Sequence, residues 1–190
     1  MLKSVTKLTQ TIEYLAAKKS LIFHIAIRYY HDVIRNEISL ANITRDDHIL
    51  CIGGGFCPFS AILLHQKTGA RVMVIDNDSA CIPEARELIE RLNLCDAIHL
   101  ECQEGCCKDI SLSQFTVVHF AMQVTPMEHV FSEVEKKVLP GTKLLIRRPK
   151  ERLSAMYCKL SKNLLDCCRF IDHRKPCNIG STYLYVKDAA

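Results

Sequence analysis

Residues 48–58 read HILCIGGGFCP, a short apolar run that ends in three consecutive glycines. The run is too short for a core helix and the glycines interrupt any regular element, which predicts a buried strand over residues 48–52. Glycine tolerates positive φ and lets backbone N–H groups approach a ligand that a Cβ would obstruct. We therefore expect this strand to lead into a ligand-binding turn.

Strands and helices alternate along the chain after this turn. Helical spacing of apolar residues predicts helices at 59–66, 81–92 and 127–138, and a further one that ends near residue 165. Apolar runs predict strands at 70–75, 97–102, 115–120 and 143–147, and a closing pair at 168–172 and 183–187 around a turn with Pro176 and Gly180. Such alternation is typical of right-handed crossovers and of a sheet covered on both faces. The fold class is therefore α/β, with a doubly wound, mostly parallel sheet.

The chain before the first strand has a different pattern. From residue 8 to residue 38 the apolar residues recur at helical spacing, which predicts two helices. The periodicity changes after the polar residues 44–47. We therefore divide the 190 residues into a short N-terminal helical cap at 1–44 and a sheet domain at 45–190.

The composition narrows the class of protein. With 48% hydrophobic and 24% charged residues, the chain is not collagen-like, a coiled coil or disordered throughout. Its 11 cysteines are odd in number and irregularly spaced, which does not fit a secreted disulfide framework and predicts reduced thiols. No cysteine pair has the C-x2-C spacing typical of zinc sites, so we expect no bound metal.

Two observations bear on the location of the protein. The first residues lead into no long apolar run, and the longest uncharged stretch, 49–64, is interrupted by glycines and by Pro58. A signal peptide or a helix that spans a bilayer needs an unbroken apolar segment. We expect a cytoplasmic protein that does not enter a membrane.

The net charge of +4 is unevenly distributed. Residues 44–110 hold 6 basic and 11 acidic residues, whereas residues 143–175 hold 10 basic and 3 acidic residues. A basic stretch can attract an anionic substrate or RNA. The pattern favours an ordinary solvated surface, because aromatic residues do not alternate with these charges as base stacking requires.

The acidic residue at the end of the second predicted strand indicates the kind of ligand. In doubly wound sheets the ligand binds beyond the carboxyl ends of the strands, and Asp76 stands there, 23 residues after Gly53. A carboxylate at that place can accept two hydrogen bonds from a ribose diol. Pro58 takes the place of the third glycine in a G-x-G-x-x-G motif, which argues against NAD. Alone, the glycines could form a tight turn and residues 76–78 could cap a helix; their order favours a nucleoside.

The same residues resemble a known sequence pattern. Residues 53–60 read GGGFCPFS and are similar to the G-S-G-P-L-P-L-T motif of nicotianamine synthase-like proteins in both outer glycines, the later Pro58 and the closing hydroxyl. Arg147 is followed ten residues later by Tyr157, similar to that branch's V-R-S-A-H-G-x-R-x-F-L-Y-P motif, and Pro176 precedes the last predicted strand. The chain thus resembles the class I S-adenosylmethionine (SAM)-dependent methyltransferase superfamily, and within it the nicotianamine synthase-like branch.

The chain also departs from the patterns that it resembles. Cys51 stands where most superfamily members carry an acidic residue, and Cys57 stands where they carry the third glycine of G-x-G-x-G. In the second motif, Lys150, Glu151 and Cys158 replace the histidine, the inner glycine and the final proline. The helical region before the glycines is shorter than is usual for the branch, so no catalytic role is transferred to it residue by residue.

The resemblance implies a Rossmann-like fold, SAM as the cofactor, and an enzyme that transfers a methyl or an aminocarboxypropyl group to a small nucleophile such as an amine. SAM is a sulfonium with three S–C bonds open to attack, so the protein chiefly aligns the reactants and removes a proton. For SAM binding, we expect a backbone cradle formed by Gly53, Gly54 and Gly55, and a ribose ligand, Asp76. We expect the adenine side to be lined by Asn77, Asp78, Gln103 and Glu104, and the methionine side by Met122 and Gln123.

The resemblance places the catalytic base partly in the helical region ahead of the glycines. The polar candidates in that region are Tyr29, Tyr30, His31 and Glu37, and each could instead have a surface or interface role. Two other functions stay open. One is an RNA methyltransferase that uses the basic stretch 147–175. The other is a non-catalytic SAM- or nucleoside-binding module, consistent with the missing acid at Cys51 and the short cap. A small-molecule substrate is the expected partner, and a homodimer is a further alternative.

Overall fold

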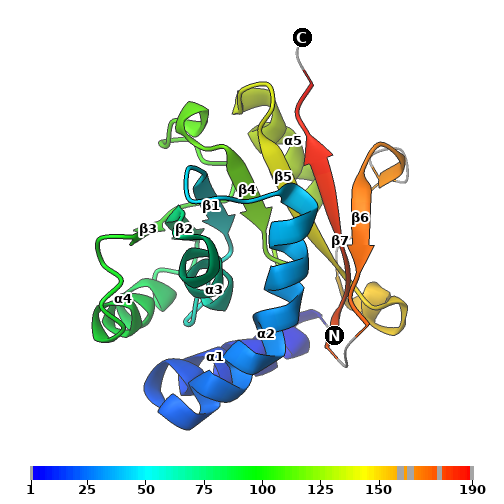
Figure 1. The fold of residues 1–190 in the computed structure, drawn as a ribbon. Helices are drawn as coiled ribbons and strands as arrows, with labels where there is room; N and C mark the ends of the chain where they lie inside the picture. The colour runs from blue at the N-terminus through cyan, green and yellow to red at the C-terminus, as the bar shows by residue number, and fades with distance from the viewer. Residues whose placement is uncertain (1, 158–160, 162–164, 175–176, 189–190) are drawn as a thin grey trace.

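The computed structural model describes residues 2–157, 161, 165–174 and 177–188. In this part of the chain seven strands form one sheet in the order β3-β2-β1-β4-β5-β7-β6 (Figure 1). The strands are β1 (His48–Ile52), β2 (Arg71–Asp76), β3 (Ile98–Cys102), β4 (Val117–Phe120), β5 (Lys143–Pro149), β6 (Arg169–Asp172) and β7 (Ile179–Val186). The first five are parallel, and β7 runs antiparallel to β5 and β6. The predicted doubly wound, mostly parallel α/β sheet is confirmed.

The strand order reverses beside β1. This strand pairs with β2 on one side and with β4 on the other, both in parallel. After β3 the chain returns across the sheet to β4, so the loops that leave β1 and β4 diverge at their carboxyl ends. A crevice forms at such a reversal, which is where open α/β sheets bind their ligands.

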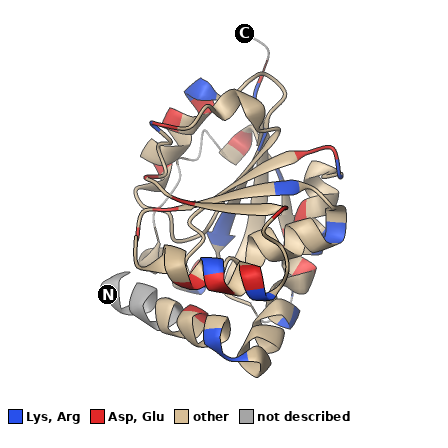
Figure 2. Cartoon of the chain, turned by 90° about the vertical axis from the view of Figure 1, so that its left-hand side faces the viewer, with Lys and Arg blue, Asp and Glu red and all other residues tan. Residues whose placement is uncertain are grey.

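Helices cover both faces of the sheet. One face carries α3 (Phe59–Thr68) and α4 (Cys81–Arg91), with α2 (Ser20–Ala41) packed over α3 and α1 (Leu2–Lys18) packed against α2 and α4. The other face carries α5 (Met127–Lys137) and the 3-10 helix η1 (Leu112–Gln114). Acidic and basic residues alternate on the outer side of α4 (Figure 2). Among the described helices, none is both long and apolar enough to cross a membrane.

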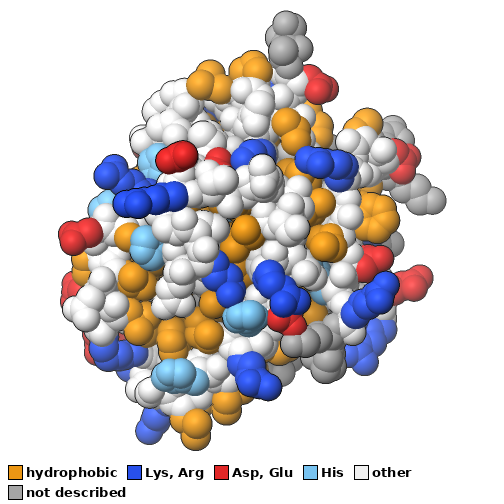
Figure 3. Space-filling view, in the orientation of Figure 1, with side chains coloured by type: hydrophobic (Ala, Val, Ile, Leu, Met, Phe, Trp, Pro, Cys, Tyr) orange, Lys and Arg blue, Asp and Glu red, His pale blue; other side chains and the backbone are white. Residues whose placement is uncertain are grey.

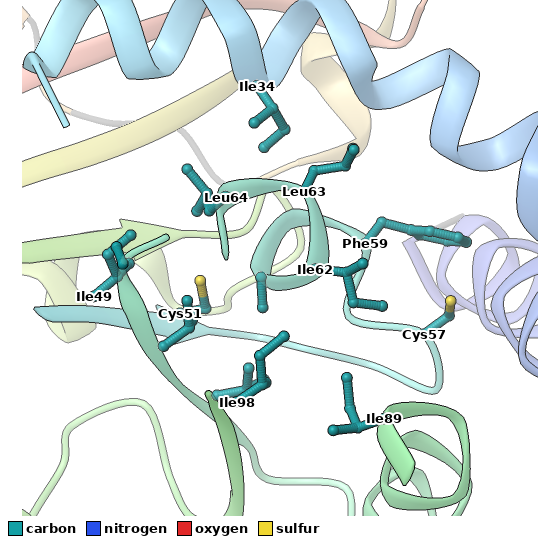
Figure 4. Packing of buried hydrophobic residues seen from close by; sticks show 14 of the residues in the cluster. Ile34, Ile49, Cys51, Cys57, Phe59, Ile62, Leu63, Leu64, Ile89 and Ile98 are labelled. Carbon is teal, nitrogen blue, oxygen red and sulfur yellow. The ribbon is translucent and has the colours of Figure 1, made fainter. Parts of the chain in front are cut away.

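The alternation of side chains along β1 joins the two halves of the core. Ile49 and Cys51 pack toward the α2–α3 side, whereas Leu50 and Ile52 pack toward α5. On the first side α3 lies between α2 and the sheet, and Figure 4 shows Ile34 of α2 above the leucines of α3 with Cys51 of the sheet below. Because both faces are buried, the strand is apolar at almost every position.

Two predicted elements near the C-terminus differ from the structure. The helix expected after β5 is a 3-10 helix, η2 (Glu151–Met156), and Tyr157 is extended, so a continuous helix to residue 165 is wrong. No residue of η2 is buried, and a short helix without packing is not stable in water. Residues 158–160 and 162–164 of that expected helix, and the predicted motif residue Pro176, lie outside the described residues.

The last strand, β7, begins at Ile179 instead of residue 183. Its first residues pair with the end of β5, where Ile179 lies opposite Pro149 and Ser181 lies opposite Arg148. Gly180, which suggested a turn in the sequence, continues the strand. A Cβ on Gly180 would stand 3.0 Å from the carbonyl oxygen of Pro149, so the glycine permits close approach of two backbones.

Candidate functional site

A cavity of about 300 Å³ lies at the carboxyl ends of β1, β2, β4 and β5. Its walls come from the turn after β1, from the ends of the neighbouring strands, from α1 and α2, and from the start of β7. Nine of the ten residues predicted to bind SAM line it: Gly53, Gly54, Gly55, Asp76, Asn77, Asp78, Gln103, Met122 and Gln123.

Glycine is required at the three positions of the turn for two different physical reasons. Gly53 and Gly55 have φ values of 88° and 62°, a left-handed conformation that side chains with a Cβ rarely adopt. Gly54 has no such φ, but a Cβ there would stand 2.3 Å from Cγ1 of Val74. The turn therefore excludes side chains at all three positions and presents backbone to the cavity.

Asp76 ties the end of β2 to this turn. Its Oδ2 accepts a hydrogen bond of 2.7 Å from the backbone N–H of Gly55, and its Oδ1 accepts one of 3.0 Å from the N–H of Asp78. The carboxylate is thereby fixed in orientation and half-buried at the cavity wall. Each oxygen keeps a second lone pair for a ligand hydroxyl.

Of the two residues predicted past β3, only one lies in the cavity. Gln103 lines the wall, because its backbone N–H continues the ladder to the carbonyl oxygen of Asp76. Glu104 lies outside the cavity, with a side chain that is 72% exposed and 3.9 Å from Nζ of Lys108. The chain turns at Glu104, whose carbonyl oxygen accepts a hydrogen bond from the N–H of Cys107, and its side chain points to solvent.

Glu13 of α1 lines the cavity and was missed by the sequence reasoning. Its carboxylate packs on the glycine turn, since a Cβ on Gly55 would stand 2.2 Å from Oε2 of Glu13. Burial and the nearby charge of Asp76 raise the pKa of Glu13 to about 8. A hydrogen bond from the backbone of Phe56 has a smaller, opposite effect on this pKa. A usable signal existed, because Gln10, Glu13 and the buried Ala17 recur at helical spacing on one face.

The candidates for the catalytic base separate into two groups. Tyr29 and Tyr30 line the cavity, and the hydroxyl of Tyr29 accepts a 2.6 Å hydrogen bond from the backbone N–H of Asn178. Burial raises the pKa of both tyrosines, which keeps them protonated. His31 lies outside the cavity beside the end of α3, where its Nε2 is 2.8 Å from Nζ of Lys67.

Glu37 also lies outside the cavity, at the centre of a buried polar network. Its Oε1 accepts hydrogen bonds of 2.7 Å from Nε of Arg147 and from Oγ1 of Thr182. Its Oε2 lies 2.8 Å from Nη2 of Arg147 and 3.3 Å from Nε2 of His119. Burial opposes ionisation, but the charges and hydrogen bonds of Arg147 and His119 outweigh it and hold the pKa of Glu37 below its ordinary value. A carboxylate so engaged positions its neighbours and does not accept a substrate proton.

Arg147 and His119 carry this network to the cavity, which both of them line. Burial and the charge of Arg147 lower the pKa of His119, so its imidazole is neutral and its Nε2–H donates to Glu37. Nη1 of Arg147 donates a 2.8 Å hydrogen bond to Oγ of Ser60. Ser60 closes the glycine–proline motif and Arg147 is the arginine of the second motif, so the two matched motifs meet in space.

Three cysteines from different elements line the cavity: Cys51, Cys57 and Cys81. Burial raises the pKa of each thiol, to about 12 for Cys51, so they are protonated and poor nucleophiles. Within the described residues, no three His, Cys, Asp or Glu side chains are grouped so that they could hold a metal ion.

Comparison with known proteins gives two curated relatives and no matching family profile. L-histidine 2-aminobutanoyltransferase of Yersinia pestis is 34% identical over 65 residues, which are 34% of this chain and 24% of that protein. The enzyme of the same name from Pseudomonas aeruginosa is 26% identical over 117 residues, which are 60% of this chain and 43% of that protein. The matches thus cover less than half the length of either relative.

Solved structures match over more of the chain. A Glu-to-Gln variant of MtNAS, a nicotianamine synthase, has a TM-score of 0.82 at 22% identity, covering 98% of this chain and 74% of that one. Other MtNAS structures contain MTA and tNA, or SAM. An RNA methyltransferase from Salinibacter ruber has a TM-score of 0.63 at 16% identity, covering 84% and 92%. The chain therefore has the fold of the class I SAM-dependent methyltransferases and is similar, over nearly its whole length, to nicotianamine synthase.

Proposed function

We propose that the protein is a SAM-dependent transferase that joins the aminocarboxypropyl group of SAM, rather than its methyl group, to the amine of a small molecule. One observation carries the proposal: the glycine turn, the carboxylate of Asp76 and the acid Glu13 meet in one cavity at the reversal of strand order. Both curated relatives are 2-aminobutanoyltransferases, which favours this group over methyl.

The residues of the cavity fit SAM. The turn at 53–55 lines the cavity with backbone, and two of its glycines have positive φ, which suits a close approach of backbone N–H groups to the ligand. Asp76 has one lone pair on each oxygen left for the two hydroxyls of a ribose. Beyond it, Asp78 and Gln103 lie at the ends of β2 and β3, where an adenine amino group would find oxygen acceptors.

SAM supplies a sulfonium carbon that an amine can attack. The protein holds the two ends of the site apart: Asp76 fixes the sugar at β2, and Met122 and Gln123 lie past β4 on the other side of β1. Such fixed placement lowers the entropic cost of bringing nucleophile and carbon into line.

Glu13 is the proposed proton acceptor. An amine attacks only after it has lost its proton, and the base works best when its pKa lies near the working pH. Glu13 can reach a substrate amine, because it faces the cavity beside the glycine turn. Its pKa is raised to about 8, which is close to the working pH. Tyr29 and Tyr30 stay protonated and are suited to orient the acceptor by hydrogen bonds.

The test is to incubate the purified protein with SAM and an amine and to identify the nucleoside product by mass spectrometry. L-histidine is the first amine to use, because the curated relatives carry its name. Methylthioadenosine as the product supports aminocarboxypropyl transfer. S-adenosylhomocysteine instead means methyl transfer and contradicts the choice of group. No binding of SAM by calorimetry contradicts the whole proposal.

A second candidate, an RNA methyltransferase, has one specific observation in its favour. Phe170 of β6 is 56% exposed and stacks on Tyr183 at 5.3 Å, and the guanidinium of Arg148 lies 5.7 Å from the Tyr183 ring. Aromatic and arginine side chains of this kind can stack on bases. On the face drawn in Figure 3, however, the basic side chains are separated by hydrophobic and neutral surface. RNA retention that falls steeply with salt would support this candidate.

We also propose a cytoplasmic location, which is consistent with ten free cysteines among the described residues. The division into a cap at 1–44 and a SAM-binding domain at 45–190 stays a prediction, as does the alternative of a homodimer. A binding module without turnover is excluded by any product in the SAM assay.

A further inference from the structure

The guanidinium of Arg147 has hydrogen-bonding capacity left over at the cavity. An arginine offers five N–H groups, and three of them are used within the described chain: Nε and Nη2 donate to Glu37, and Nη1 donates to Ser60. One N–H remains on each terminal nitrogen. Two such N–H groups on a planar guanidinium match the two oxygens of a carboxylate.

The side chain that carries these N–H groups is held in place. Glu37 binds it along one edge, and the ring of Tyr30 lies 5.7 Å from its central carbon. Arg147 is only 5% exposed, so what remains accessible of it lies at the cavity that it lines. A donor fixed before the ligand arrives loses little entropy on binding.

The position of Arg147 in the sheet indicates which ligand group it meets. In the strand order β2-β1-β4-β5, the ribose-side residue Asp76 ends β2 and Arg147 lies near the end of β5. Neighbouring strands are about 4.8 Å apart, so three steps separate the two by about 14 Å across the sheet. Met122 and Gln123, past β4, lie between these ends. Arg147 therefore lies on the side of the cavity away from the nucleoside.

We propose that Arg147 binds the carboxylate of the acceptor, so that the enzyme selects an amine that carries a carboxylate over the same amine without one. This inference rests on the proposed transferase function. It assigns Glu37 the task of positioning: Glu37 holds the guanidinium, and the guanidinium contacts the substrate. The neutral His119 beside them adds no competing charge at this end of the cavity.

The experiment compares two acceptors that differ in the carboxylate, L-histidine and histamine. The ratio of their kcat/KM values is measured by methylthioadenosine release, and their affinities are measured by calorimetry in the presence of methylthioadenosine. We expect the wild-type protein to favour L-histidine by about 10-fold to 100-fold, as for two charge-assisted hydrogen bonds. The binding arm needs no turnover, so it separates this inference from the proposed reaction.

The variant is the pair Glu37→Gln with Arg147→Gln, because removing only one partner would leave a buried charge unpaired. The preference for L-histidine should fall toward one in this variant, while its SAM affinity stays close to that of the wild type. The control is Arg148→Gln, whose guanidinium lies over Tyr183 outside the cavity and should leave the preference unchanged.

Three outcomes overturn the inference. An equal loss for both acceptors, with the preference kept, means that Arg147 has only a structural role. A loss of SAM affinity with the preference kept assigns the carboxylate to SAM and not to the acceptor. A wild-type protein that binds SAM but binds L-histidine no better than histamine has no carboxylate site, and the SAM-binding part of the proposed function then still stands.

Discussion

The carboxylate of Asp76 accepts a hydrogen bond of 2.7 Å from the backbone N–H of Gly55. This contact joins the acid at the end of β2 to the turn that leaves β1, so the two features that the sequence offered separately form one structure. The turn is held by the same group that is expected to hold the ribose. Its removal should therefore affect both the ligand and the turn.

Replacing Asp76 with alanine should weaken SAM binding by about 1.5–3 kcal/mol, the usual worth of hydrogen bonds to a charged group. Isothermal titration calorimetry measures the change directly. Glu104→Ala is the control, since Glu104 was predicted for the same site but is exposed outside the cavity. Unchanged affinity in the Asp76 variant would remove that residue from the site.

Replacing Gly55 with alanine should cost more stability than the same change at Gly141. Both glycines have positive φ, 62° and 85°, so both changes carry the left-handed strain of about 1–2 kcal/mol. Only at Gly55 would the new Cβ also meet a carboxylate, that of Glu13, whereas nothing lies within 4 Å at Gly141. Urea denaturation compares the two variants. Equal losses would mean that Glu13 moves away freely and is not seated on the turn.

The activity should rise with pH through about 8, as Glu13 becomes ionised and able to accept a proton. Glu13→Gln should lower kcat and remove this limb of the pH profile of kcat/KM. Persistence of the limb in the variant would assign the titration to another group, such as the amine of the acceptor.

Glu13 also makes a prediction about stability that needs no substrate. Its pKa in the folded protein is raised above the ordinary value of 4.5, so the folded state holds the proton more tightly than the unfolded state does. The stability that this proton contributes is complete below about pH 4.5 and is lost as the pH rises through about 8. Glu13→Gln should therefore resist urea better than the wild type at pH 9 and gain less at pH 5. A constant difference between these pH values would contradict a buried, protonated Glu13.

Glu37→Gln should lower the free energy of unfolding by about 3–5 kcal/mol, because it leaves the guanidinium of Arg147 buried without a counter-charge. The pKa of Glu37 is held below its ordinary value, so its contribution is present above that value and is lost only as the pH falls through the lowered pKa. Urea titrations at neutral pH measure the loss. The control is Glu133→Gln. Glu133 pairs with Lys136 at the surface, where loss of an ion pair should change stability little. Equal effects of the two changes would contradict the importance of burial.

The arrangement of strands and helices could be predicted because apolar periodicity is a local property. The apolar run at 48–52 predicts a strand by itself. The order of the glycines and Asp76 along the chain predicts the ligand-binding turn. Gly180 shows where that reasoning fails: the glycine suggested a turn, but its role depends on the backbone of β5 that comes to lie beside it.

The rest of the site depends on how distant segments pack. Whether Tyr30 or His31 faces the cavity is decided by the rotation of α2 on α3, which no local pattern sets. Glu13 enters the site only because α1 crosses the turn after β1. Glu37 is a candidate base in the sequence, but in the structure its carboxylate is bound by Arg147, which lies 110 residues later in the chain.

The carboxylate of Glu37 connects the N-terminal helices to the sheet. Glu37 lies on a helix that precedes the sheet, yet it neutralises a cation on β5 and touches side chains of β4 and β7. Detaching the first two helices would remove both the carboxylate and the Tyr30 ring that hold this guanidinium in place. We therefore expect the two helices to fold with the strands as one cooperative unit, and a fragment that begins at residue 45 to lose the fixed orientation of Arg147 at the cavity.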